Sequence, residues 1–476
     1  MEYTTTRFPK RLLAVSAVLM LGANTVSADT NKALEAWKAF AAQSGNPNHQ
    51  KWVDEISKPE AIKLAKEWKD LRGYDAYDLI EKTKLPAELK PGLKINKDNI
   101  AQYPWLKDYM PPEAYSQLTS SWGSVKEITI VPSNTYYMHK GYLNGTKELR
   151  DKGIEIQVND KGELVYPDGS FALLSGPGAT SIPFLHPKNG LELNWSYVAH
   201  STNSDTLNFQ PIHFRACTDE SKVDVEYKAD LWWWHYHNRQ NVGPAGEIPG
   251  KEEFIEGGSI FFNEPFDIRG LAGVRQRYAE SGKPDDFKVF IPSLKRTRVL
   301  AGSDAQDPLA SGLDLTWDDW RAYWGKTDID AFEYKLAGEA FILAIPETGY
   351  VYDAATQAAD KCNYDSMELE LRPVWILDII DKTGKYQYAK RRTWVDKEFY
   401  YMQYHTTWDP RGNVYRTWED SRAFRPTEGD AQWRLSILNN HVTKRSGGFF
   451  VDAGWENREN EVTEEMFDID LLRDYQ

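Results

Sequence analysis

The chain has 476 residues and a formal net charge of −14, enough length for a large core or for two to three domains. A protein this acidic would repel a phosphate backbone and an anionic membrane surface, so we predict no nucleic-acid partner. Its 18 Trp, 26 Tyr and 19 Phe either fill a core or line a site for an apolar or sugar-like ligand.

The first 28 residues have the pattern of a removable secretory signal. Arg7, Lys10 and Arg11 form a short basic region, an apolar run covers residues 12–23, and small residues precede a cleavage site after Ala28. The run is shorter than the roughly 20 residues that cross a bilayer as a helix. No cysteine follows the predicted cleavage site, so no lipid attachment is expected. We predict an exported protein of the periplasm with no integral membrane segment; the alternative is an uncleaved N-terminal anchor.

The chain contains two cysteines, Cys217 and Cys362. In an oxidising compartment an even pair predicts one disulfide, and the alternative is two buried free thiols. Two cysteines so far apart do not suggest a metal site.

Residues 29–120 are predicted to form a helical N-terminal segment that wraps the sheet. A first stretch behind Thr30 carries apolar residues at helical spacing (Leu34, Trp37, Phe40 and Ala41), and Pro59 begins a second helix. Each helix has one apolar face that needs a cover. A connection rich in Pro and Asn follows up to residue 120.

From about residue 125 the apolar period changes to two, which is typical of strands. Residues 154–158, which alternate apolar and polar side chains, and residues 163–166 flank the turn-forming sequence Asn-Asp-Lys-Gly at 159–162, which predicts a hairpin. A meander follows later, with strands predicted at 374–380, 386–395, 399–408 and 414–418. Short turns require antiparallel pairing. One short inserted helix is expected near 316–325, begun by Thr316 with Asp319 in a capping-box-like position.

These elements predict the α+β class, with an antiparallel β domain over residues 121–476 and the N-terminal helices packed on its sheet. A concave space between the two layers would suit an apolar ligand.

The densest aromatic feature runs from Leu231 to His237. If this is one strand, Trp232, Trp234 and Tyr236 share a face. They either line a ligand cavity or form core beneath the helical layer. His235 and His237 also point the same way, but no third ligand lies at a convincing spacing, so we predict no metal.

Arg296 and Arg298 are two positions apart, so on a strand their two guanidinium groups lie on the same face. They are candidates to hold a carboxylate or phosphate head group; the alternative is pairing with acidic neighbours. The same alternatives apply to the basic residues 390–392. We find no nucleophile-elbow, zincin, P-loop or dinucleotide-binding motif, and we predict no catalytic residues and no cofactor.

Several stretches in the same order resemble the domain of unknown function 1329 family. They are residues 181–195, 290–299, 316–319, 372–375, 388–391 and 408–412. The resemblance runs from about residue 125 to the end. Typical members have a Gly-Asn-x-Asp-Gly segment near the mature start, where this chain has residues 45–48, and Val-Pro-Tyr-Asn where it has residues 344–347.

Members of that family are exported proteins of Gram-negative bacteria, grouped with the lipoprotein carriers LolA and LolB. The resemblance implies a highly curved antiparallel half-barrel with helices as a lid, an apolar cargo, and a resistance-nodulation-division type transporter as partner. We therefore predict a periplasmic carrier or transporter-accessory protein for a lipid or other hydrophobic molecule. The alternatives are an envelope enzyme acting on glycan or lipid, which needs a carboxylate pair or a His–acid pair in a cleft, and a structural partner of an envelope complex, which needs an exposed apolar patch.

Overall fold

The computed structural model describes residues 31–200, 204–240, 242–301, 305–322, 325–349, 362–451 and 461–475. The chain divides into two units, Met1–Asn31 and Lys32–Gln476, and the second holds the elements described here. The predicted signal segment and its cleavage site lie outside the described residues. Within the described residues, no helix is both long and apolar enough to cross a membrane.

The second unit begins with helices. They are α1 (Lys32–Ser44), α2 (Pro47–Ile56), α3 (Pro59–Arg72), α4 (Ala76–Ile80) and, further on, α5 (Pro112–Gln117). The two predicted helices are confirmed as α1 and α3, and α3 ends at Gly73 in the left-handed region (φ 87°). Apolar spacing does not reveal α2, because it buries only His49, Trp52 and Val53.

A fifteen-stranded sheet forms the body of the unit among the described residues. Its middle is β12 (Met367–Asp381), β13 (Lys390–Asp396), β14 (Met402–Trp408), β15 (Val414–Arg425), β16 (Asp430–Asn440) and β17 (Arg445–Val451). It continues through β5 (Thr206–Cys217), β6 (Val223–His235), β7 (Phe254–Glu264), β8 (Ala272–Tyr278), β9 (Asp286–Ile291) and β10 (Arg296–Val299). The predicted meander is confirmed as β12–β15.

At the other side of β12 lie β11 (Phe332–Ala344) and β2 (Glu127–Ile130), and β2 pairs in turn with β1 (Lys94–Asn96). The β2–β12 contact is parallel, which corrects the expectation of a purely antiparallel sheet. The predicted hairpin is present as a separate pair, β3 (Gln157–Val158) and β4 (Leu164–Val165). The sheet is open, since β1 and β10 each end the order of strands. The α+β prediction is confirmed.

Two helices occupy the region where we expect strands, and that expectation is wrong there. They are α6 (Lys140–Lys152) and α7 (Gly190–Val198). Helix α7 begins at Asn189, whose side chain accepts from the amide of Glu192, and α6 ends at Gly153 in the left-handed region. Such local capping signals are stronger evidence of a helix than weak alternation of apolar residues.

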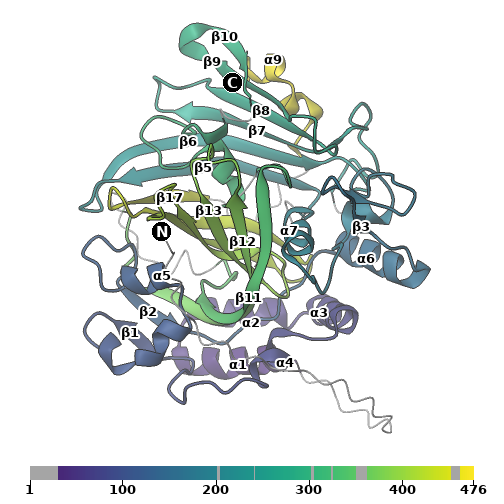
Figure 1. Cartoon of the computed structure of the whole chain (residues 1–476). Coiled ribbons are helices and arrows are strands. Elements are labelled where there is room, and N and C mark those ends of the chain that lie inside the picture. Colours follow the sequence, from purple (N-terminus) through teal and green to yellow (C-terminus); the bar gives the residue numbers. More distant parts are fainter. Residues whose placement is uncertain are drawn as a thin grey trace. The chain divides into compact units, whose positions relative to one another are not determined.

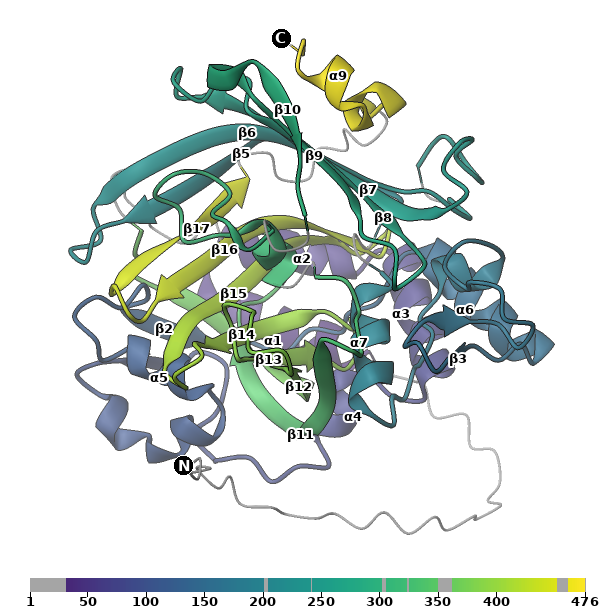
Figure 2. The same ribbon diagram turned by 45° about the horizontal axis from the view of Figure 1, so that its top comes forward.

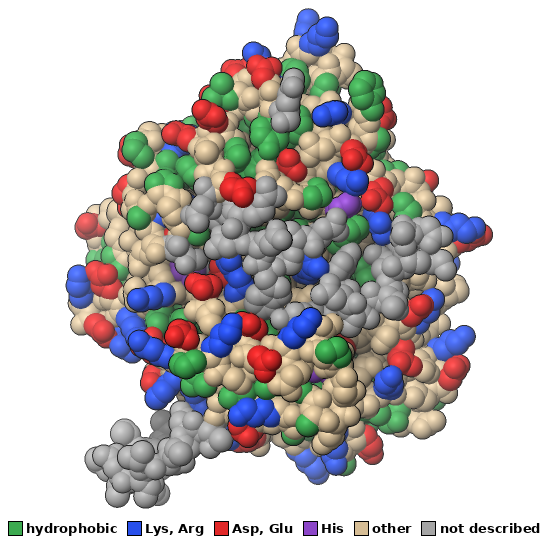
Figure 3. Space-filling view, turned by 180° about the vertical axis from the view of Figure 1, so that it is seen from behind, with side chains coloured by type: hydrophobic (Ala, Val, Ile, Leu, Met, Phe, Trp, Pro, Cys, Tyr) green, Lys and Arg blue, Asp and Glu red, His purple; other side chains and the backbone are tan. Residues whose placement is uncertain are grey.

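The N-terminal helices cover one face of the central strands (Figures 1 and 2). Trp37, Trp52 and Trp68 are buried in one core with Phe424 of β15 and Phe449 of β17. The opposite face packs on the segment around α5, β1 and β2, which forms a second core. Figure 3 shows acidic and basic side chains interspersed on the face seen from behind.

A fully buried ionic cluster ties the helices to the sheet. Arg372 of β12 binds Asp396 through its Nε (2.7 Å) and Glu398 through its Nη2 (2.8 Å). Arg72 of α3 reaches the same Glu398 carboxylate (3.2 Å). All four side chains have no exposed surface. Helix α3 is therefore joined to the sheet by paired charges as well as by apolar contact.

Candidate ligand site on the sheet

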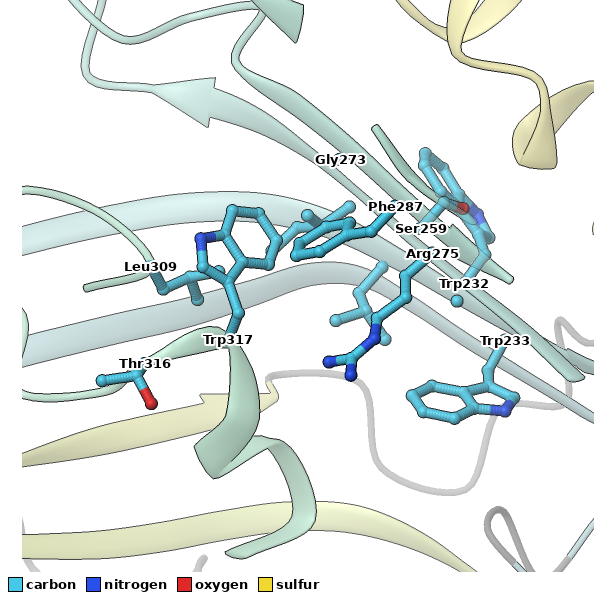
Figure 4. Close-up of a pocket in the computed structure, with 12 residues that line it drawn as sticks. Trp232, Trp233, Ser259, Gly273, Arg275, Phe287, Leu309, Thr316 and Trp317 are labelled. Carbon is cyan, nitrogen blue, oxygen red and sulfur yellow. The ribbon is translucent and has the colours of Figure 1, made fainter. Parts of the chain in front are cut away.

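Strands β6–β9 carry a small apolar cavity on one face, which we call the inner face (Figure 4). The strand registers align Leu231, Ile260 and Gly273 across β6, β7 and β8, and align Trp233, Gly258, Arg275 and Phe287 beside them. Side chains opposite one another in a sheet share a face. All seven line the cavity, whose volume is about 40 Å³.

The absence of a side chain at Gly273 leaves space on the sheet, and the ring of Trp317 covers that space. The ring of Trp317, in the short helix η6 (Trp317–Ala322), lies so close to Gly273 that an added Cβ would be 2.8 Å from its Cη2. Trp317 also meets the ring of Phe287 edge to face, with centroids 5.1 Å apart. A side chain at position 273 would occupy the place of the Trp317 ring.

Polar contacts hold η6 against the sheet. Asp318 accepts hydrogen bonds from Arg275 (3.2 Å) and from the Tyr386 hydroxyl (3.0 Å). Asp319 accepts from the Tyr388 hydroxyl (2.8 Å) and pairs with Arg416 (3.3 Å). The predicted start of this helix is confirmed, since the Thr316 amide and hydroxyl both donate to the Asp319 carboxylate.

A groove of about 460 Å³ adjoins the cavity; both charged and apolar side chains line it, and Arg275 and Phe287 line the groove and the cavity alike. Burial opposes the charge on Arg275, but Asp285 and Asp318 more than offset this effect and raise the pKa of its guanidinium. Burial also lowers the pKa of Lys326, another lining residue, to about 8. An apolar surface therefore leads directly to charged groups, an arrangement suited to an amphiphile.

The side chains of the aromatic residues singled out from the sequence point to the opposite, outer face, although Trp232 also belongs to the lining of the cavity. Trp232, Trp234 and Tyr236 are 0%, 3% and 0% exposed. The rings of Trp234 and Tyr236 pack on Phe467, and that of Trp232 packs on Tyr475. Their cover is thus the C-terminal segment, residues 461–475, rather than the N-terminal helices. Figure 4 shows Trp232 and Trp233 leaving opposite faces of β6, with Trp233 on the cavity side.

Arg296 and Arg298 lie on β10, the last strand of the sheet, and both are exposed. Neither has an acidic partner among the described residues. Arg298 is opposite Val289, which is opposite Gly273. Arg298 is therefore the last residue of a cross-strand row that starts at Leu231 on β6 and passes through Ile260 and Gly273. Residues 390–392, in contrast, pair with acids: Lys390 and Arg392 with Asp378, and Arg391 with Asp319.

The two neighbouring histidines make contacts that do not resemble a metal site. His237 hydrogen-bonds Glu247 through Nδ1 and the Phe254 carbonyl through Nε2. Burial lowers the pKa of His235 to about 4. Among the described residues, no group of three His, Cys, Asp or Glu could hold a metal ion.

The predicted disulfide is confirmed: Cys217, at the end of β5, is bonded to Cys362. The bond closes a long loop that contains β6–β11. It agrees with an oxidising compartment.

Sequence reasoning missed the residues that shape the cavity. Gly273 is an isolated glycine within a strand, a signal for close approach of another group. Trp317 stands in the segment that resembles the family, but nothing local shows that its ring reaches β8.

Fold and site define an α+β protein with an open sheet, an apolar cavity and a neighbouring charged groove. The chain matches the model of a protein family of unknown function, DUF1329, over residues 94–473. It belongs to this family. No functionally curated protein matches it.

Three solved structures are similar in fold. A Vibrio parahaemolyticus domain, named a putative outer membrane lipoprotein-sorting protein, is 15% identical, with a TM-score of 0.40 over 60% of this chain and 98% of that one. A DUF1329 protein from Desulfovibrio piger is 15% identical, with a TM-score of 0.38 over 56% and 92%. A LolA superfamily protein from Nitrosomonas europaea is 12% identical, with a TM-score of 0.32 over 55% and 90%. These values are too low to transfer a ligand or partner.

Proposed function

We propose that this protein is a periplasmic carrier for an anionic amphiphile such as a lipid. The observation that supports the proposal is the row Leu231–Ile260–Gly273–Val289–Arg298, which crosses the inner face from the apolar cavity to an exposed cation. Five adjacent strands span about 19 Å, the length of a typical acyl chain. The apolar chain would lie along this row, and the head group would bind Arg296 and Arg298.

Binding requires η6 to move. Small-molecule sites usually have about 300–1,000 Å³, whereas this cavity has about 40 Å³, room for roughly one water molecule. We propose that the cargo displaces Trp317 from Gly273 and takes its place on the sheet. The curved half-barrel implied by the family and a resistance-nodulation-division type transporter as partner are finer parts of this proposal. Of the three aromatic residues singled out from the sequence, Trp232 lines the cavity, whereas Trp234 and Tyr236 pack on Phe467 at the outer face and take no part in the proposed binding.

Binding is favoured over catalysis by the position of the perturbed acids. Burial raises the pKa of Glu347 and of Glu419 to about 7. Glu347 has no exposed side-chain surface and pairs with Arg422 (2.6 Å). Neither residue lines the cavity or the groove that adjoins it.

The test is binding of a fluorescent anionic fatty acid, with native mass spectrometry of protein purified from membrane extract as a second readout. Gly273→Leu should reduce affinity at least tenfold, because the new side chain occupies the row. Arg298→Gln should weaken binding of the anionic probe but leave binding of its uncharged methyl ester unchanged. Arg411→Gln, in the exposed β14–β15 turn, is the matched control. No bound lipid in the native protein, together with unchanged affinity in Gly273→Leu, would refute the proposal.

A further inference from the structure

Strand β10 is a free edge of the sheet. It pairs with β9, and no other described strand pairs with it. All four of its residues are exposed. An unpaired edge is a template for strand addition unless something blunts it.

The register shows which backbone groups are free. Leu300 donates its amide to the Phe287 carbonyl (2.8 Å), continuing the β9–β10 ladder. Hydrogen-bonded pairs alternate in an antiparallel ladder, so the amides of Arg296 and Arg298 face β9. The amide and carbonyl groups of Thr297 and Val299 therefore point away from the sheet, toward any added strand.

The outer face of this edge carries exposed apolar side chains among charged ones, since Lys288, Glu464 and Asp470 line the same groove. Val299 is 73% exposed and Leu471, in the C-terminal segment, is 54% exposed. Both line a groove of about 590 Å³ between that segment and β8–β10. Leu294, in the turn that leads into β10, is also exposed. Three of the six large, exposed hydrophobic side chains among the described residues thus lie at this one edge.

The inner face of the edge is basic. Arg296 and Arg298 point there, without an acidic partner among the described residues, in a chain with a net charge of −14. Two copies of β10 paired with each other would place arginine opposite arginine, and directly opposed like charges are destabilising. A second copy of this chain is therefore a poor fit.

We propose that the β10 edge binds an extended segment of a partner protein as an additional antiparallel strand. Acidic side chains of the segment alternate with apolar ones: the acidic ones face Arg296 and Arg298, and the apolar ones face Val299 and Leu471. Strand addition of this kind gives affinity through the main chain and specificity through alternate side chains. This docking function goes beyond cargo binding and does not require it.

The experiment measures fluorescence anisotropy with a labelled peptide of alternating Glu and Val, flanked by Gly and Ser, against the same peptide with Lys for Glu. Thr297→Pro removes an outward amide without removing a β9–β10 hydrogen bond. Thr297→Val keeps that amide and is the matched control. We expect the Glu–Val peptide alone to bind, with at least a tenfold loss in Thr297→Pro and no loss in Thr297→Val.

Hydrogen exchange on the wild-type protein gives a second readout that needs no variant: the Thr297 and Val299 amides should become protected when the Glu–Val peptide binds. Thr297→Pro leaves both arginines in place, so it separates edge pairing from head-group binding. Unchanged binding in Thr297→Pro, equal binding of the two peptides, or no binding of the Glu–Val peptide at about 1 mM would each overturn the proposal.

Discussion

Replacing Arg372 with Met tests whether the buried ionic cluster holds the N-terminal helices on the sheet. Besides its bonds to Asp396 and Glu398, Arg372 donates through Nη1 to the Asn134 carbonyl (2.6 Å). Met has a similar length and no charge. The change leaves three buried carboxylates, those of Asp396, Glu398 and Glu370. Arg72 is then the remaining guanidinium in contact with Glu398.

The expected loss follows from that imbalance. Removing one partner of a buried ion pair costs about 3–5 kcal/mol, because the other charge stays buried without compensation. Whole proteins are stable by only about 5–15 kcal/mol, so Arg372→Met should remove a large part of the total. The double variant Arg372→Met/Asp396→Asn should recover part of the loss, since it also removes one uncompensated charge.

The assay is urea unfolding followed by tryptophan fluorescence, with Arg411→Gln as an exposed control expected to change the free energy of unfolding by less than about 0.5 kcal/mol. A loss below about 1 kcal/mol in Arg372→Met would refute the reasoning. A double variant less stable than Arg372→Met would also contradict it.

Three further predictions concern the disulfide, the Glu419 carboxyl and the C-terminal segment. Reducing the Cys217–Cys362 bond should lower the free energy of unfolding by about 5 kcal/mol in the chain-entropy model, measured by urea unfolding with and without reductant, and no change would contradict the model. Burial raises the folded-state pKa of Glu419 from 4.5 to about 7, so stability from this group is greatest below pH 4.5 and is lost as the pH rises through 7. The melting temperature of Glu419→Gln should therefore fall less between pH 5 and pH 8 than that of the wild-type protein. An equal fall in both proteins would show that Glu419 does not cause the pH dependence. Phe467→Ala should cost about 3–5 kcal/mol and shift the fluorescence to the red as Trp234 becomes hydrated; unshifted emission would show that the C-terminal segment does not shield it.

Local patterns were sufficient for the elements with strong periodicity. The apolar spacing of α1 and α3, the turns of the β12–β15 meander and the Thr316–Asp319 start of η6 all depend on residues close in sequence. Helix α7 escaped prediction because its apolar face is weakly marked. Helix α6 escaped because it is polar overall and contains two glycines, which disfavour a helix.

The candidate site depends on contacts between residues far apart in the chain. Alternation on β6 predicts that Trp232 and Trp233 lie on opposite faces, but it cannot show which face holds a cavity. That was decided by Phe467 and Tyr475, which cover the outer face from the far end of the chain, and by Trp317, which reaches Gly273 from η6.

By itself, the sequence determined the α+β class, the cysteine pair and the two arginines on one face, because these follow from period, count and alternation. Only the tertiary structure decided that Cys217 meets Cys362, that Arg298 ends the row of the cavity, and that β10 is left without a second neighbour. The physical reason is that strand register and packing are settled by the burial of the whole sheet, which no local stretch encodes.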